Sequence, residues 1–159
     1  YFNACGAALD GSMGENHDPE THIIPRAILS LFENKPFMLF GTDYHTPDGT
    51  CVRDYIHVLD LIEAHVLALK KLEKGQGGFQ YNVGTGKCYS NKEVLEMIKK
   101  VSGKEIVITN AQRRTGDADT LVADPTKIQT ELGFMPKFSD LETIVKSAWK
   151  WHNRKESKK

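Results

Sequence analysis

Residues 40–58 read Phe-Gly-Thr-Asp-Tyr-His-Thr-Pro-Asp-Gly-Thr-Cys-Val-Arg-Asp-Tyr-Ile-His-Val. The first half is a polar loop, in which Pro47 fixes one backbone torsion and Gly49 permits a positive φ. From Cys51 onward apolar and polar residues alternate, which predicts a strand with Val52 and Arg53 on opposite faces. An arginine beside aromatic rings, where a loop meets a strand, suits a phosphate that its planar fork can grip. A lone arginine of this kind is more often part of a surface ion pair, so this run alone leaves both interpretations open.

The composition limits the classes of partner. The 159 residues carry 21 basic and 21 acidic side chains, and no basic tract is interleaved with aromatics. Neither nucleic acid nor an anionic membrane is therefore expected as a partner. No apolar stretch approaches the length of a membrane span. The length predicts a single domain over residues 1–159.

The cysteines and histidines predict neither disulfides nor a metal site. Cys5, Cys51 and Cys88 are widely spaced and odd in number, which favours reduced thiols in a cytoplasmic protein. The six histidines show no His-x-x-x-His pair and no His/Cys cluster, so no metal is expected. The chain begins at Tyr1 rather than at a methionine, which we interpret as the sign of a longer parent protein.

Capping signals and apolar spacing predict alternating helices and strands. The signals include Ser90 with Glu93, Asp60 with Glu63, and a Ser-Asp-Leu-Glu run from residue 139. The expected helices are 22–33, 60–72, 90–103, 124–133 and 139–149, and the expected strands are 1–3, 37–40, 53–58, 79–83 and 104–109. This alternation predicts an α/β fold.

Several short motifs, in their order and spacing, resemble the C-terminal part of the UDP-glucose (UDP-galactose) 4-epimerases. These enzymes belong to the extended short-chain dehydrogenase/reductase superfamily. The motifs are the run 40–58, Tyr1-Phe2-Asn3, His22-Ile23-Ile24-Pro25, Tyr81-Asn82-Val83-Gly84-Thr85-Gly86 and Arg113-Arg114-Thr115-Gly116-Asp117. The resemblance, from residue 1 to about residue 152, implies a C-terminal substrate-binding domain that keeps the last strands of a Rossmann sheet. The NAD-binding N-terminal domain would be absent.

The resemblance implies eight substrate-binding residues. They are Asn3, His22, Met38, Phe40, Arg53, Arg114, Asp117 and Leu121. Arg53 and Arg114 match the pair of arginines that clamps the diphosphate, whose negative charges need partners once water is excluded. Asp117 matches the acid that accepts from the ribose hydroxyls. Without the resemblance, Asp117 could equally pair with Arg113 or Arg114 on the surface.

The remaining polar and aromatic positions each have a plainer alternative. Phe40, with the backbone of Met38, matches the shelf for the uracil, and is otherwise a core residue. Asn3 matches the asparagine that reaches the diphosphate, and is otherwise the cap of a strand end. His22 lies where relatives place an asparagine near the phosphate, and is otherwise a helix N-cap.

Three further assignments concern the cofactor and the sugar. Tyr1 and Phe2 match residues beside the nicotinamide of NAD, and are otherwise ordinary strand aromatics. Leu121 matches the position that limits the room beside carbon 2 of the sugar. Since leucine is smaller than the tyrosine of some relatives, we hypothesise tolerance of N-acetylated hexoses.

The motifs that carry the family's chemistry do not occur in this sequence. There is no Gly-x-x-Gly-x-x-Gly motif for NAD and no Tyr-x-x-x-Lys pair, so no catalytic residue is assigned. We expect binding of UDP-glucose or UDP-galactose without catalysis by this chain alone. The alternatives are a non-catalytic nucleotide-sugar-binding module, or part of a nucleotide-sugar dehydratase or a uronate 4-epimerase. Unpaired strand edges also allow a homodimer or a swapped self-associate.

Overall fold

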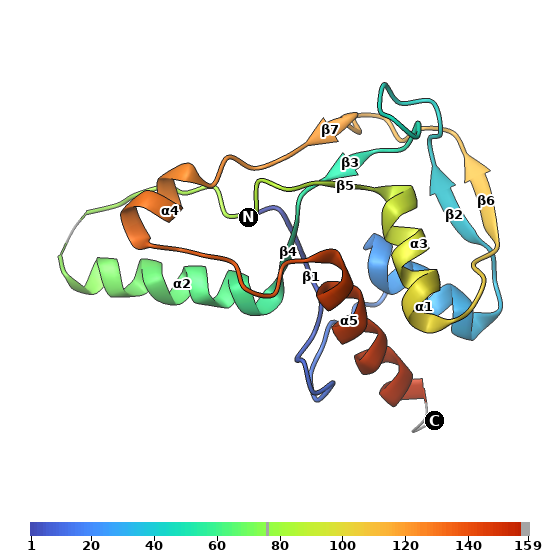
Figure 1. The fold of residues 1–159 in the computed structure, drawn as a ribbon, viewed down its shortest axis with the longest axis horizontal. Helices are drawn as coiled ribbons and strands as arrows, with labels where there is room; N and C mark the ends of the chain where they lie inside the picture. The colour runs from blue at the N-terminus through green and yellow to red at the C-terminus, as the bar shows by residue number, and fades with distance from the viewer. Residues whose placement is uncertain (76, 157–159) are drawn as a thin grey trace.

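The computed structural model describes residues 1–75 and 77–156, and these form short strands with longer helices between them (Figure 1). The elements are β1 (Asn3–Cys5), α1 (Ile23–Glu33), β2 (Phe37–Phe40), β3 (Val52–Arg53), β4 (Tyr55–His57), α2 (Val58–Glu73), β5 (Tyr89–Ser90), α3 (Asn91–Ser102), β6 (Ile108–Ala111), β7 (Thr120–Leu121), α4 (Thr126–Leu132) and α5 (Leu141–Glu156). The predicted α/β class is confirmed. Within the described ranges, no helix is long and apolar enough to cross a membrane.

The strands pair in three small sheets. β1 runs parallel to β4, and β2 runs parallel to β6, with Phe37 opposite Ile108 and Phe40 opposite Ala111. The third sheet has the order β5-β3-β7, in which β3 is antiparallel to β5 and parallel to β7. β3 and β4 are separated only by Asp54, so the segment around Arg53 links two sheets.

Two hydrophobic clusters hold the elements together. The larger one lies among α1, α3, α5 and β2, and the smaller one joins α2, α4 and β4. Figure 1 shows α2 and α4 on one side of the molecule, and α1, α3, β2 and β6 on the other. The smaller cluster is centred on Ile56, Ile128 and Phe134, all almost fully buried.

A buried carboxylate, that of Asp54 between β3 and β4, fixes the turn at residues 84–86, ahead of β5. Asp54 accepts from the amides of Thr85 and Gly86 at 3.0 and 2.9 Å, and from the Thr85 hydroxyl at 2.8 Å. The amide of Ala123 donates to the same carboxylate at 3.3 Å. A Cβ at Gly84 would lie 2.8 Å from Asp54 Oδ2, so only glycine lets this turn approach so closely.

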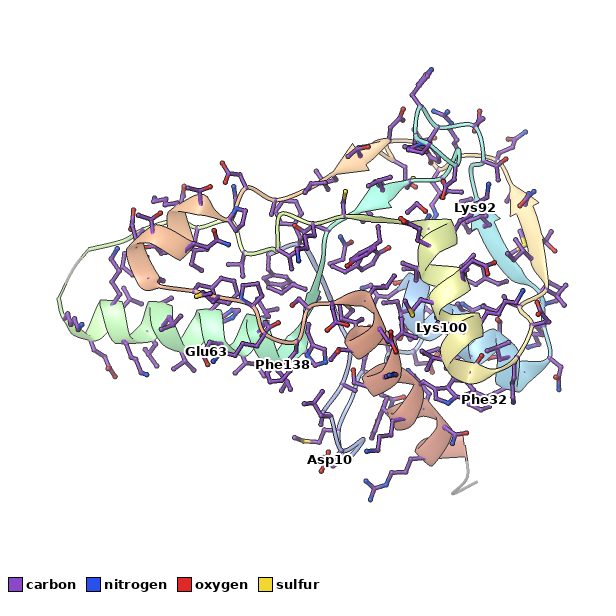
Figure 2. The ribbon with its side chains drawn as sticks, in the orientation of Figure 1. Asp10, Phe32, Glu63, Lys92, Lys100 and Phe138 are labelled. Atoms are coloured by element: carbon purple, nitrogen blue, oxygen red, sulfur yellow. The ribbon has the colours of Figure 1, made fainter. Side chains whose placement is uncertain are left out.

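The predicted helix α3 begins as its sequence indicates. The Ser90 hydroxyl accepts from the amide of Glu93, whose carboxylate accepts from the Ser90 amide, and the helix ends at Gly103. The predicted start at Asp60 is wrong, because α2 is capped by the His57 ring. Asp60 is instead buried and accepts from the amides of Lys137 and Phe138, at 2.9 Å each. Figure 2 shows Phe138 beside the start of α2.

The strand predictions were less accurate than the helix predictions. The strand expected at 37–40 is confirmed, and the one expected at 53–58 is divided at Asp54. The one expected at 104–109 begins four residues later, and the one at 1–3 begins at Asn3. No strand is assigned at 79–83, where the amide of Phe2 still donates to the Val83 carbonyl at 3.0 Å. Single bonds of this kind carry no periodic signal in the sequence.

Candidate functional site

A cavity of about 650 Å³ lies between α1, β2, β3 and the segment that follows β6. The residues that line it are Asn3, Glu20, Thr21, His22, Ile23, Arg26, Phe37, Met38, Leu39, Phe40, Cys51, Arg53, Tyr55, Asn91, Arg114 and Asp117. Seven of the eight residues predicted to bind substrate are in this set. The volume falls within the range typical of small-molecule sites.

Arg53 is held in place by backbone carbonyls. Its Nη1 donates to the carbonyls of Val52 and Ala118, at 2.9 and 2.7 Å. Its Nη2 lies 3.7 Å from a carboxylate oxygen of Asp117, and its side chain is only 14% exposed. The guanidinium is therefore oriented before any ligand arrives, and its charge is only loosely balanced by Asp117.

Arg114 and its neighbour Arg113 have different surroundings. Arg114 stacks over the ring of Phe40, 4.4 Å from the centroid, and forms no ion pair within the described residues. Arg113 stacks over Tyr44 and donates from Nε to Asp43 at 2.7 Å. The hydrogen bond from Arg113 is the main cause that lowers the pKa of the Asp43 carboxyl. Arg113 thus stabilises the loop that contains Asp43 and Tyr44, whereas Arg114 lines the cavity.

The other cavity residues supply donors and a flat apolar wall. Asn3 donates from its side-chain amide to the Asp54 carbonyl at 2.6 Å, which leaves its own amide oxygen for another partner. Met38 is 45% exposed on β2, next to the Phe40 wall. Burial raises the pKa of Tyr55, so its hydroxyl stays protonated.

Three predicted positions lie outside the cavity lining. Leu121 is 50% exposed and lies opposite Arg53 in the β3–β7 ladder. This position gives no support to the hypothesis about carbon 2 of the sugar. Tyr1 is 76% exposed, with its ring centroid 6.4 Å from that of His65. The amide of Phe2 is bonded to the Val83 carbonyl.

The structure also brings to this region some residues that the sequence motifs do not include. Arg26 and Asn91 line the cavity, and no motif singled them out. A group of two glutamates and two histidines also gathers at its edge: Glu15, His17, Glu20 and His22. The available signal was Glu-x-His, which occurs twice with a five-residue offset.

Comparisons with known proteins agree with the motifs. Residues 1–84 match the NAD dependent epimerase/dehydratase family. The chain is 51% identical, over 153 residues, to the UDP-glucose 4-epimerase of Lactobacillus helveticus, a match that covers 96% of this chain and 46% of that relative.

Solved structures show the same similarity in three dimensions. The UDP-glucose 4-epimerase of Stenotrophomonas maltophila, with bound NAD and formylated UDP-arabinopyranose, matches with a TM-score of 0.94 and 33% identity, covering 100% of this chain and 48% of that one. The enzyme of Bifidobacterium longum, in complex with NAD⁺ and UDP, matches with a TM-score of 0.90 and 37% identity, covering 98% and 47%. The expected similarity to part of an extended short-chain dehydrogenase/reductase is confirmed. The chain spans about half the length of these relatives.

Proposed function

Since the chain belongs to the NAD dependent epimerase/dehydratase family, we propose that it forms the UDP-sugar-binding part of a UDP-glucose 4-epimerase. The whole enzyme would interconvert UDP-glucose and UDP-galactose by oxidising and re-reducing carbon 4 of the sugar. Residues 1–159 would act as one substrate-binding unit without a catalytic residue of their own.

The observation that carries this proposal is the convergence of two arginines on one cavity. Arg53 and Arg114 come from segments about 60 positions apart in the sequence, and both line the same cavity. Arg114 has no carboxylate partner within the described residues, and Arg53 has one at 3.7 Å. Two cations in one partly closed site suit a diphosphate, because a buried dianion needs charged donors.

The other lining residues fit the remaining parts of a uridine diphosphate. Phe40 offers a flat ring for the uracil, with Arg114 over the ring. Asp117, 34% exposed, offers acceptor oxygens for the ribose hydroxyls. The free amide oxygen of Asn3 and the half-buried Asn91 side chain are further polar groups around the ligand.

NAD is the proposed cofactor of the whole enzyme, as the relatives bind NAD. When bound, NAD supplies the removal and return of a hydride at the sugar carbon. In this chain Tyr1 and Phe2 are the residues proposed to touch it. The exposed Tyr1 ring, just ahead of β1, fits the edge of a flat nicotinamide. Such contacts would orient the nicotinamide ring rather than bind the phosphates of NAD.

The test is calorimetric titration of UDP into the 159-residue chain and into three arginine variants. Arg53→Ala and Arg114→Ala each remove a proposed phosphate contact, and should weaken binding by about 10- to 100-fold. Arg113→Ala is the matched control, because Arg113 is adjacent in sequence but bonded to Asp43 outside the cavity lining. It should change the dissociation constant by less than about threefold.

Equal affinity in the wild type and in both cavity variants would rule out the clamp. Equal loss in all three variants would show a general charge effect instead of a built site. UDP-galactose binding with NAD-dependent turnover, in the longer parent enzyme, would separate this proposal from a module that only binds nucleotide sugars.

The proposal also covers self-association of the chain and its cellular location. The β1–β4 pair has two strands, so each has one edge outside the ladder, which supports a homodimer or a swapped self-associate. Sedimentation over a range of protein concentrations tests this. The cytoplasmic location remains the expectation drawn from the free cysteines, two of them buried.

A further inference from the structure

Four side chains from the segment between β1 and α1 place their ligating atoms within 4.8 Å of one another. His17 Nδ1 lies 2.7 Å from Glu15 Oε1, and His22 Nδ1 contacts the same oxygen. Glu20 joins them through both oxygens: Oε1 lies 3.2 Å from His22 Nδ1, and Oε2 lies 3.8 Å from His17 Nδ1. The two rings are tilted, with centroids 5.2 Å apart.

The two carboxylates of this group are poorly exposed and lack strong cationic partners. The side chain of Glu20 is 4% exposed and that of Glu15 is 19% exposed. Among the described residues, neither forms an ion pair with a lysine or arginine; their only ionisable partners are His17 and His22. Two neighbouring carboxylates out of water repel each other unless a cation lies between them.

The surrounding backbone holds the two carboxylates in position. Glu20 Oε1 accepts from the amides of Thr21 and His22, at 2.8 and 2.9 Å, which fixes the carboxylate plane. The carbonyl of Glu15 accepts from the Trp151 indole at 2.8 Å, which ties this segment to α5. A Cβ at Gly14 would lie 2.4 Å from the Trp151 ring, so the approach requires glycine. In Figure 1 the segment after β1 lies beside α5.

We propose that Glu15, His17, Glu20 and His22 form a structural Zn²⁺ site in which each side chain donates one atom. Zinc takes four ligands at about 2.0–2.2 Å, so tetrahedral ligand atoms lie about 3.4 Å apart. Atoms already gathered within 4.8 Å need only small rotations to reach this spacing. Two imidazoles with two carboxylates suit zinc better than magnesium or calcium, which prefer oxygen alone.

The position of the site gives the ion a structural effect. Glu20, Thr21 and His22 line the large cavity, and His22 is the N-cap residue of α1. A dication would cancel the charge of both carboxylates at the edge of that cavity and close the loop 15–22 into a ring. If the proposed UDP site is correct, zinc would also remove a repulsive charge from its border; this last point rests on the proposed function.

Metal binding by the 159-residue chain tests the site without any nucleotide. The chain is stripped with a chelator, returned to chelator-free buffer and titrated with Zn²⁺ by calorimetry, with metal content measured after dialysis. We expect one ion per chain. His17→Gln and His22→Asn should each lower the affinity by at least about 100-fold, since each removes a direct ligand. His45→Gln is the matched control, because His45 pairs with Asp119 outside the cluster.

A spectroscopic measurement separates a built site from loose surface binding. The Co²⁺-substituted chain should show the strong visible absorption of tetrahedral cobalt, and Glu20→Gln should abolish it while the far-ultraviolet circular dichroism stays unchanged. Less than about 0.1 ion per chain would overturn the proposal. So would an equal affinity in His17→Gln and His45→Gln, which would mean an adventitious ion only. Because no step uses UDP, a failed UDP titration would leave this result intact.

Discussion

At the residue scale, buried carboxylates in this protein are satisfied by backbone amides rather than by cations. Asp54 is fully buried, and its carboxylate receives bonds from two separate places in the sequence: Thr85 with Gly86, and Ala123. This single side chain therefore links the β3–β4 junction to two loops, and holds Arg53 at the cavity.

Replacing Asp54 should destabilise the whole chain. In Asp54→Asn, an NH₂ group must face amide donors, so the free energy of unfolding should fall by about 2–4 kcal/mol. Urea unfolding followed by circular dichroism measures this. Asp43→Asn is the control, because the Asp43 carboxylate is exposed and its replacement should leave the unfolding midpoint nearly unchanged. Similar midpoints for both variants would show that the Asp54 bonds contribute little.

His57 makes the stability depend on pH. Its Nδ1 accepts from the Leu59 amide and its Nε2 donates to Ser147, so the neutral ring fits the site. Burial lowers the pKa of His57 below 6.5. The unfolded chain then binds a proton that the folded chain does not, so stability is full above pH 6.5 and falls as the pH drops toward the lowered pKa.

The measurement is the urea midpoint between pH 5 and pH 8. His57→Gln should lower the midpoint at pH 8 and remove part of the decline below pH 6.5. His45→Gln, whose side chain is 93% exposed, should keep the decline of the wild type. An unchanged decline in His57→Gln would assign the pH dependence to other groups.

At the element scale, helix ends were predictable where the cap is local. Ser90 and Glu93 belong to one turn, so their reciprocal bonds can be inferred from four consecutive letters. Asp60 has the same local pattern, but its carboxylate accepts hydrogen bonds from residues 137–139, far along the chain. Long-range partners of this kind leave no trace in a short sequence window.

Ser90→Ala should lower the free energy of unfolding by about 1–2 kcal/mol, since Ser90 caps α3 and its hydroxyl also contacts Asp48. Ser102→Ala, in the last turn of the same helix, should change it by less than about 0.5 kcal/mol. Thermal unfolding of both variants provides the comparison. A larger effect at Ser102 would contradict the role of the cap.

The sequence predicted part of the cavity lining. The family resemblance grouped Arg53, Arg114 and Asp117, and the structure has all three on one cavity, whereas Leu121 lies outside it. Arg26 could not be inferred, because it reaches the cavity only through the packing of α1. The four-residue cluster at 15–22 was missed because its ligating atoms meet through an irregular loop rather than through helical spacing.

At the scale of the whole molecule, two separate clusters suggest two units of local stability. Ile128 is 1% exposed in the small α2–α4 cluster, and Ile144 is fully buried in the large one. Ile128→Ala should cost about 2–5 kcal/mol and speed hydrogen exchange in α2 and α4, with α1, α3 and α5 unchanged. Ile144→Ala should instead speed hydrogen exchange in α1, α3 and α5, with α2 and α4 unchanged. Faster exchange across all five helices in either variant would mean one cooperative unit.

The two tryptophans lie in different environments, so their intrinsic fluorescence should differ. Trp149 is stacked flat on Phe32, whereas Trp151 rests over Gly14 and is bonded to the carbonyl of Glu15. The emission maximum of Trp151 should therefore shift whenever the loop that contains Gly14 and Glu15 is rearranged. Trp151 is therefore an intrinsic fluorescent probe of this loop. In a Trp149→Phe background its emission could be measured alone, without an added dye.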